Sequence, residues 1–305
     1  MWTIRHGAAR GGTLAVVTWW EAVILGLVQG LTEFLPVSSS AHVRVVGPLL
    51  PNGADPGAAF SAIIQLGTEL AVLLYFRHDI ARITRAWWRA LWGRQGTSLS
   101  RRLGSRSSDA RLAWWVIVGT LPIVVLGVLF RDVVEGSLRN LWITAAVLAL
   151  FALVLGYADA VGRKNRDLRH LKARDAIALG FAQAAALIPG VSRSGGTISM
   201  GLFLGLNRTA AARYSFLLAI PAVIGSASFE WITNAQEITS ATGPGIAATL
   251  IATAVAFVVG YVVIIWFLAL VSRRTFFPFV VYRIALAGVI VVFLTLGILD
   301  PISGA

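Results

Sequence analysis

The sequence predicts an all-α polytopic membrane protein with six transmembrane helices and two re-entrant helical hairpins, arranged as an inverted repeat. Three observations predict this fold class. The 305 residues are 57% hydrophobic with a mean hydropathy of +0.78, and only 13% are charged, which is typical of chains that cross a bilayer several times. Two apolar segments are interrupted by Pro36 and Pro189, and each then becomes rich in serine. The two segments align when the chain is shifted by 154 residues, which places Gln29 on Gln183, and a shift near half the chain length indicates duplication.

The first interrupted segment is expected to form a re-entrant hairpin. Residues from about 14 to 35 are apolar and helical, Pro36 then breaks the helix, and residues 39–50 form a short second helix. We expect the two pieces to enter the membrane together, because spanning it independently takes about 20 residues. Residues 175–206 predict a second hairpin at the corresponding place. Broken helices at matching places in two halves are typical of a site near the bilayer midplane.

Apolar stretches long enough for full transmembrane spans occupy most of the remaining sequence. They belong to one membrane domain that covers residues 1–305, with a first inverted repeat at 14–158 and a second at 175–298. The predicted spans lie at about 58–76, 112–130, 141–158, 213–231, 246–271 and 279–298.

Arginine and lysine are distributed unevenly among the loops. The 77–111 loop contains nine and the 159–174 loop contains six, whereas 232–245 contains none. The short 272–275 turn carries two further arginines. Because basic loops remain on the cytoplasmic side, we expect these three segments inside and both termini outside. The hairpins then enter from opposite faces, and their broken tips can meet near the midplane.

Composition also excludes some classes of function. The net charge of +12 raises the alternative of nucleic-acid binding, but the positive-inside rule accounts for the arginines, and no nucleic-acid partner is expected. The chain contains no cysteine, which excludes disulfides, thiolate metal sites and cysteine nucleophiles. The first residues lack the pattern of a cleavable signal, so no processing is expected.

Ionisable and hydroxyl side chains gather at the two breaks, where they suit phosphoryl transfer. Arg193 supplies a fork of donors for phosphate oxygens. The Ser39 hydroxyl becomes a nucleophile if Glu33 or His42 takes its proton. His42 follows Ser39 by three residues and shares its helical face, which also suits His42 as the acid that protonates a leaving phosphate. Gln29 lies one turn before Glu33, and this oxygen pair is a candidate site for a divalent cation.

The start of the helix after each break is also a candidate anion seat. Backbone N–H groups are free there, and Ser38 and Ser40 add hydroxyls beside Ser39. Ser39 and Arg193 occupy equivalent places in the repeat, each just after its break. We therefore expect the Ser39 hydroxyl and the Arg193 guanidinium to lie about 4–8 Å apart, on two sides of one phosphate.

Each of these signals has a structural alternative. Serine runs in membrane helices often join helices by hydrogen bonds. His42 is also compatible with a packing role, and Glu33 with Arg193 is compatible with a structural pair between the hairpins. A phosphate seat equally fits a lipid-phosphate transporter or flippase. From the residues alone, catalysis and transport remain equally open, although a transporter does not need a Ser39–His42 pair.

The two motifs resemble a known family, the bacterial undecaprenyl-diphosphate phosphatases of the bacitracin-resistance type. The first signature is matched by QGLTEFLPVSS at 29–39, and the second by PGVSRSG at 189–195 followed by Thr197. Similarity at 60–75, 214–221 and 278–283 extends the resemblance over nearly the whole chain. It implies a hydrolase of the bacterial inner membrane that removes the terminal phosphate of a C55 isoprenyl diphosphate lipid and so recycles the carrier for cell-wall synthesis.

The resemblance also implies roles for particular residues. Ser39 is the family's proposed nucleophile, His42 its acid or base partner, and Glu33 with Gln29 serves activation or metal binding. The family's active site opens to the outer face, a divalent cation such as Mg²⁺ or Ca²⁺ supports activity, and a homodimer is frequent. Phosphate is expected to be held by Arg193 together with the hydroxyls of Ser38, Ser40, Ser192, Ser194 and Thr197.

Three residues depart from the family pattern. Ala41 stands where glycine is usual, which crowds a close backbone approach to phosphate. Gln29 in place of glutamate removes one charged metal ligand. Glu69 lies within a span where an apolar residue is expected, and it either lines the lipid cavity, snorkels or pairs with another helix, of which we favour pairing.

Overall fold

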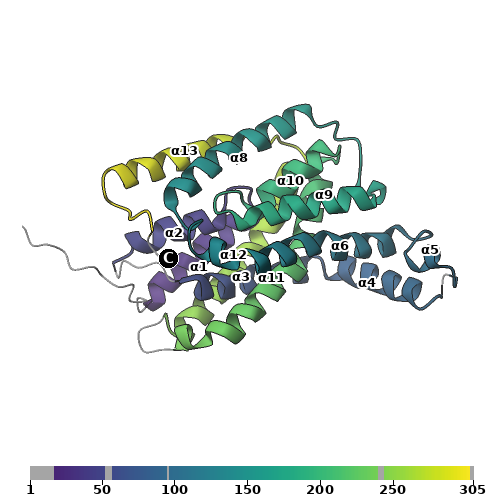
Figure 1. Ribbon diagram of the computed structural model, residues 1–305, viewed down its shortest axis with the longest axis horizontal. Helices are drawn as coiled ribbons and strands as arrows, with labels where there is room; N and C mark the ends of the chain where they lie inside the picture. The colour runs from purple at the N-terminus through teal and green to yellow at the C-terminus, as the bar shows by residue number, and fades with distance from the viewer. Residues whose placement is uncertain (1–16, 52–56, 95, 240–243, 303–305) are drawn as a thin grey trace, which may run out of the picture.

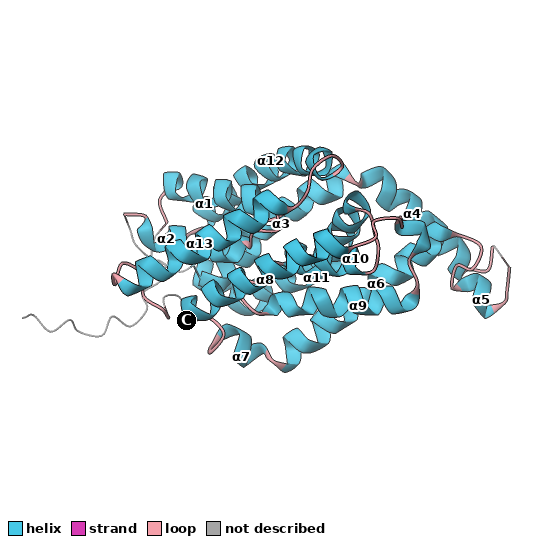
Figure 2. Cartoon of the chain, turned by 90° about the horizontal axis from the view of Figure 1, so that it is seen from above, coloured by secondary structure: helices cyan, strands magenta, loops and turns pink. Residues whose placement is uncertain are grey.

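The computed structural model describes residues 17–51, 57–94, 96–239 and 244–302, and they form a bundle of helices (Figure 1). Figure 2 shows the same helices joined by mostly short loops. Within these ranges there is no β-strand, only an isolated bridge between Arg166 and Leu206. The all-α prediction is confirmed, while the predicted helix start near residue 14 and the side of the N-terminus lie outside the described residues. The elements are α1 (Trp19–Thr32), α2 (Ser39–Leu49), α3 (Gly57–Tyr75), α4 (Arg77–Leu91), α5 (Leu99–Arg102), α6 (Ser108–Leu129), α7 (Arg131–Glu135), α8 (Leu141–Val161), η1 (Leu168–His170), α9 (Ala173–Ala184), η2 (Ala185–Leu187), α10 (Arg193–Phe203), α11 (Arg208–Thr239), α12 (Ile246–Val271) and α13 (Phe277–Thr295).

Among the described residues, five helices are long and apolar enough to cross a membrane alone, namely α6, α8, α11, α12 and α13. The sixth predicted span corresponds to α3, which passes the same test only together with α4, from which it is bent by 75°. Large apolar side chains such as Val128, Leu153 and Val258 are exposed on the outer faces of these helices. Such faces suit contact with lipid, because the backbone groups of a helix are satisfied internally.

The two proline-interrupted segments are broken helices, as predicted. α1 ends at Thr32 and α2 begins at Ser39, while η2 follows α9 and ends at Leu187, before α10 begins at Arg193. α2 packs against α1, and α10 packs against α9, so each segment folds back on itself. The bounds of α2 and α10 differ by the same 154 residues that align the two motifs in the sequence.

Glycines hold α1 and α9 close to one neighbouring helix each. A Cβ atom on Gly26 of α1 would lie 2.5 Å from the Ala252 carbonyl oxygen of α12. A Cβ atom on Gly180 of α9 would lie 2.6 Å from the Gly119 carbonyl oxygen of α6. Close backbone approach at small residues is typical of membrane helix packing. The helices that lead into the two breaks are therefore fixed against long spans.

The 77–111 segment was expected to be a loop, and the structure corrects this, because α4 and α5 lie within it. Ile83 and Ala90 of α4 are buried, and α4 packs against α6. The arginines of α4 lie mostly on its exposed face, which makes α4 an amphipathic helix. The high density of arginine hid this periodicity.

The basic segments gather at one end of the molecule. Residues from 77–111, 159–174 and 272–275 line one common cavity. α5, which belongs to the first of these segments, lies at one end of the molecule, and α13 ends near the other (Figure 1). This arrangement agrees with the prediction that the three basic segments share one side of the membrane.

Candidate active site

Glu33 lies directly after α1 and joins the two broken segments. Its Oε2 atom accepts hydrogen bonds from the Ser39 hydroxyl at 2.6 Å and from the Gln29 side-chain amide at 2.7 Å. Its Oε1 atom pairs with the Arg193 guanidinium, and the two side chains are 5% and 17% exposed. Attraction between charges is stronger in such a largely dry place than in water. One carboxylate is therefore bonded to the first residue of both α2 and α10.

The predicted meeting of the two serine-rich motifs is confirmed by these contacts. Ser39 and Arg193 bond to the two oxygens of the same carboxylate, so both side chains reach one small space. A second bond between the segments runs from the Ser194 hydroxyl to the Leu35 carbonyl at 2.9 Å. The structural pairing of Glu33 with Arg193 and the proposed catalytic role are thus compatible, because the pair lies beside a hydroxyl that can react.

Arg283 of α13 fastens both breaks from behind. Its fully buried guanidinium donates to the carbonyl oxygens of Pro36 at 3.0 Å, Gly190 at 2.7 Å and Val191 at 3.1 Å. Carbonyl groups at a helix break lack helical partners and need such donors. No motif in the sequence pointed to Arg283, although a charged residue within an apolar span is itself a signal of function.

His42 does not contact Ser39 directly. Its Nδ1 atom lies 2.7 Å from the Ser38 carbonyl oxygen, and its Nε2 atom lies 2.7 Å from the Tyr282 hydroxyl. A carbonyl oxygen can only accept, so Nδ1 carries a proton, and in the neutral ring Nε2 accepts from Tyr282. The two rings are parallel within 3°. The hydroxyl partner of His42 is therefore Tyr282, which the sequence analysis did not single out, while the basic partner of Ser39 is Glu33.

The residue before the second helix of each broken segment has a positive φ. Ser38 has a φ of 71° and Ser192 a φ of 68°, and among the described non-glycine residues only Lys164 shares a positive φ. Such a conformation costs about 1–3 kcal/mol and persists where the surroundings impose it, often at functional sites. Each serine also lies within hydrogen-bonding distance of the serine two residues later, at 3.3 Å and 3.1 Å. The shared strain indicates that both breaks hold one required geometry.

Most of the other predicted phosphate-binding hydroxyls stabilise the breaks. Ser192 accepts a bond from the Gly195 backbone N–H at 3.1 Å and so caps α10. Thr197 donates to the Arg193 carbonyl at 2.7 Å and approaches Ser215. Ser38, Ser192, Ser194 and Thr197 are buried, whereas Ser40 is exposed and Ser39 is half-buried. Ser39, Ser40 and Arg193 are thus the side chains of this set that an incoming phosphate can reach.

Glu69 of α3 is 1% exposed, and neither of its carboxylate oxygens has a hydrogen-bond partner among the described residues. The favoured prediction, that Glu69 pairs with another helix, is therefore wrong, and its burial also excludes snorkelling. Its neighbour Thr68 and Phe34, which follows Glu33, face the same Gly260 of α12. Glu69 thus belongs to the surroundings of the Glu33 site.

Within the described ranges, no group of three or more histidine, cysteine, aspartate or glutamate residues is arranged to hold a metal ion. Gln29, Glu33 and Glu69 bring oxygen-bearing side chains to this site, and of the two carboxylates Glu33 is bonded whereas Glu69 has no hydrogen-bond partner among the described residues. Two carboxylates and an amide are donors of the kind that Mg²⁺ and Ca²⁺ accept.

The amino-acid sequence of this chain is similar to those of known proteins. The family described as bacitracin resistance protein BacA matches residues 22–289, which include all the site residues above. The chain belongs to this family. Its relatives include undecaprenyl-diphosphatase of Arthrobacter sp. (strain FB24), which is 58% identical over 88% of this chain and 92% of that protein. Undecaprenyl-diphosphatase of Paenarthrobacter aurescens (strain TC1) is 54% identical over 93% of this chain and 100% of that protein. Undecaprenyl-diphosphatase 2 of Agrobacterium fabrum (strain C58) is 55% identical over 92% of this chain and 98% of that protein. The resemblance drawn from the motifs is confirmed.

Proposed function

We propose that this protein is an integral membrane phosphatase that hydrolyses undecaprenyl diphosphate to undecaprenyl phosphate and inorganic phosphate. It thereby recycles the lipid carrier for cell-wall synthesis. The names of its relatives support this activity and favour hydrolysis over the transporter alternative. The observation that carries the proposal is the Glu33 carboxylate, which binds a hydroxyl and a guanidinium at once.

Glu33 is the general base for Ser39 in this proposal. The 2.6 Å between the Ser39 hydroxyl and Glu33 Oε2 is within reach for proton transfer. The Ser39 oxygen bonds to the terminal phosphorus while its proton passes to Glu33. The bond from that phosphorus to the bridging oxygen breaks, and its electron pair leaves with the lipid phosphate, which takes the proton from Glu33. A water molecule then gives a proton to Glu33 and bonds to the phosphorus, the bond from that phosphorus to the Ser39 oxygen breaks, and the Ser39 oxygen takes the proton from Glu33. In the alternative mechanism, water that gives its proton to Glu33 or His42 attacks the terminal phosphorus directly.

Arg193 receives the terminal phosphate. A guanidinium has several N–H donors in a fork that matches phosphate oxygens, so an incoming phosphate can replace Glu33 Oε1 on Arg193. The first intrahelical bond of α10 runs from the Gly196 N–H to the Ser192 carbonyl, which leaves the earlier N–H groups of Arg193 and Ser194 for an anion. Substrate binding would therefore release Glu33 from its pair and make it a better base in the same event.

We also propose that Glu33, Gln29 and Glu69 together hold a divalent cation, Mg²⁺ or Ca²⁺. The unpartnered, buried carboxylate of Glu69 supports this assignment, because a buried carboxylate without a partner is costly. The Gln29 amide nitrogen is bonded to Glu33, so its oxygen is the atom for a cation. Such an ion supplies charge neutralisation on the diphosphate oxygens.

The remaining proposals concern location. The enzyme is placed in the bacterial cytoplasmic membrane, with the basic segments inside and the site opening to the outer face. The gathering of the basic segments at one end of the molecule supports this orientation. A homodimer is proposed from the family resemblance alone.

Release of inorganic phosphate from C55 isoprenyl diphosphate by the purified protein in detergent tests the function without a membrane gradient. We expect wild-type protein to release phosphate and Ser39→Ala to lose most of this activity. Ser40→Ala is the matched control and should be milder, since Ser40 has no bond to Glu33. If the wild-type protein binds the diphosphate but releases no phosphate, the transporter alternative would be favoured over the phosphatase. Substantial turnover by Ser39→Ala would favour direct attack by water.

A further inference from the structure

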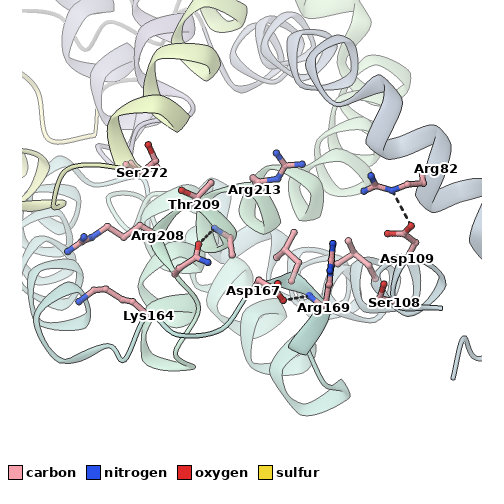
Figure 3. A pocket seen from close by; sticks show the side chains of 15 residues that line it. Arg82, Ser108, Asp109, Lys164, Asp167, Arg169, Arg208, Thr209, Arg213 and Ser272 are labelled. Carbon is pink, nitrogen blue, oxygen red and sulfur yellow. Dashed lines mark hydrogen bonds and ion pairs between the residues drawn. The ribbon is translucent and has the colours of Figure 1, made fainter. Parts of the chain in front are cut away.

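A second hollow lies apart from the Glu33 site. A cavity of about 940 Å³ is lined by residues of α4, α6, the segment between α8 and α9, the start of α11 and the end of α12 (Figure 3). It shares no lining residue with the candidate active site. All three basic segments of the sequence contribute to its wall. The positive-inside rule requires only that these arginines lie on one side of the membrane. In the structure, several of them also line one cavity.

Cationic side chains outnumber carboxylates on the wall of this cavity. The carboxylates are Asp109 and Asp167, and the cationic side chains are Arg82, Lys164, Arg169, Arg208 and Arg213. The excess persists when Asp79 and Asp159, which pair with some of these cations, are included. A concave surface lined mainly by one sign of charge concentrates ions of the opposite sign. The cavity therefore attracts anions.

Two carboxylates outside the wall hold the cations in place. Asp79 accepts from Arg213 at 2.6 Å and from Arg82 at 2.8 Å. Asp159 accepts from Arg208 at 2.6 Å. Each arginine is fixed through one or two of its N–H groups and retains other donors. Donors that are already positioned lose less freedom when they bind a ligand.

One cation in this cavity has no such partner. The Arg169 guanidinium has no hydrogen-bond or ion-pair partner within the described part of the chain, and the side chain is exposed. α6 and α11 also begin at the cavity, with Ser108 and Arg208 on its wall. Helix N-termini carry partial positive charge, which adds to the charge of the side chains. An anion in the cavity would thus meet both free and fixed donors.

Aromatic side chains place this cavity near the membrane surface. Trp87 of α4 and Trp114 of α6 pack with ring centroids 5.6 Å apart. Trp115 of α6 donates to the Leu171 carbonyl, in the segment that also lines the cavity, at 3.1 Å. Tryptophan is enriched at the level of lipid headgroups. Basic pockets between membrane helices at this level are suited to phosphate-bearing headgroups.

We propose that this cavity binds the phosphate of an anionic phospholipid headgroup from the adjoining leaflet. A lipid headgroup and free phosphate would both present a phosphate anion to this cavity. The tryptophans beside the cavity favour the lipid as the source of that phosphate. The site lies outside the reaction centre, so it would stabilise the protein in anionic membranes without taking part in hydrolysis.

The test compares binding of phosphatidylglycerol, phosphatidylcholine and inorganic phosphate to the purified full-length protein in neutral detergent. Arg169→Gln and the double variant Arg169→Gln/Arg213→Gln are compared with wild type. The control is Arg94→Gln/Arg106→Gln, which removes the same charge from exposed arginines of a basic segment that do not line the cavity. We expect affinity for phosphatidylglycerol to fall about fivefold in the single variant and about thirtyfold in the double variant, from about 1 kcal/mol for each cation near the lipid.

The control variant is expected to bind phosphatidylglycerol as wild type does, and phosphate release by Arg169→Gln should be unchanged. If the control variant loses as much affinity for phosphatidylglycerol, the lipid is attracted by the basic surface as a whole, and the proposed site would be overturned. Equal binding of phosphatidylcholine, or an equally strong response to inorganic phosphate, would overturn the anionic lipid as ligand.

Discussion

A single carboxylate connects side chains that lie far apart in the sequence. Glu33 binds Gln29 and Ser39 nearby and Arg193 in the other half of the chain. Glu69 is the contrasting case, because its carboxylate is also buried but has no hydrogen-bond partner in the described ranges. A polar group is retained in such a place at a cost in stability when it serves function. Substitution of Glu33 is therefore expected to affect activity, whereas substitution of Glu69 is expected to affect stability.

Glu69→Leu is expected to raise the thermal stability of the purified protein. The substitution replaces an unpartnered polar group by an apolar one, and such groups cost about 1–3 kcal/mol in proteins. Thermal unfolding in detergent measures this gain. Stabilisation by Mg²⁺ or Ca²⁺, measured in the same way, should disappear. Glu69→Gln is the control, since it stays polar and should gain little. Undiminished cation stabilisation in both variants would remove Glu69 from the cation site.

Sequence reasoning found the members of this site that lie within its two motifs and missed those supplied by α13. Glu33, Ser39 and Arg193 stand out because they are polar groups at helix breaks in apolar sequence. Tyr282 and Arg283 make their contacts across more than 90 residues of chain, and no local pattern encodes such packing. The pairing of Ser39 with Glu33 rather than His42 likewise depends on how the chain turns at the break.

The two broken segments are similar in backbone but not in chemistry. Ser38 and Ser192 share a strained conformation, and α2 and α10 have matching bounds. The sequence predicts these breaks because proline and the 154-residue shift mark them directly. The carboxylate is present only in the first segment, since Leu187 occupies the place equivalent to Glu33. Gln183, the equivalent of Gln29, is accordingly buried with no side-chain partner among the residues described.

Glycine contacts between helices make a prediction at this scale. A Cβ atom on Gly67 of α3 would lie 2.1 Å from the Thr253 carbonyl oxygen of α12. We expect Gly67→Ala to lower the free energy of unfolding by about 1–3 kcal/mol through overpacking. Gly225 of α11 is the control, because a Cβ atom there meets nothing within 4 Å, and alanine is the better helix former. Chemical unfolding in detergent measures both. A stable Gly67→Ala protein would show that α3 and α12 are free to separate.

The basic segments lie at one end of the molecule, and α13 ends near the other (Figure 1). Arginine counts predicted this polarity, because charge asymmetry decides orientation in a membrane. They did not predict α4, whose arginines lie on a helix rather than in a loop.

Single cysteines test the orientation, because the chain has none of its own. A membrane-impermeant maleimide added to intact cells should label Ile302→Cys, near the C-terminus. Ser100→Cys, in a basic segment, should react only after lysis. Both positions are exposed, so access depends on the side of the membrane. The reverse labelling pattern would invert the topology and put the site on the other face.

The central claim is that Glu33 takes the proton of the attacking group while Arg193 holds the phosphate. Glu33→Gln keeps the size and hydrogen-bonding shape of the side chain but cannot accept that proton. The most direct measurement is the rate of phosphate release from C55 isoprenyl diphosphate by this variant, after its fold has been checked by gel filtration. We predict a loss of about 10²–10⁴-fold, the usual contribution of a general base, and a loss below about tenfold would contradict the account.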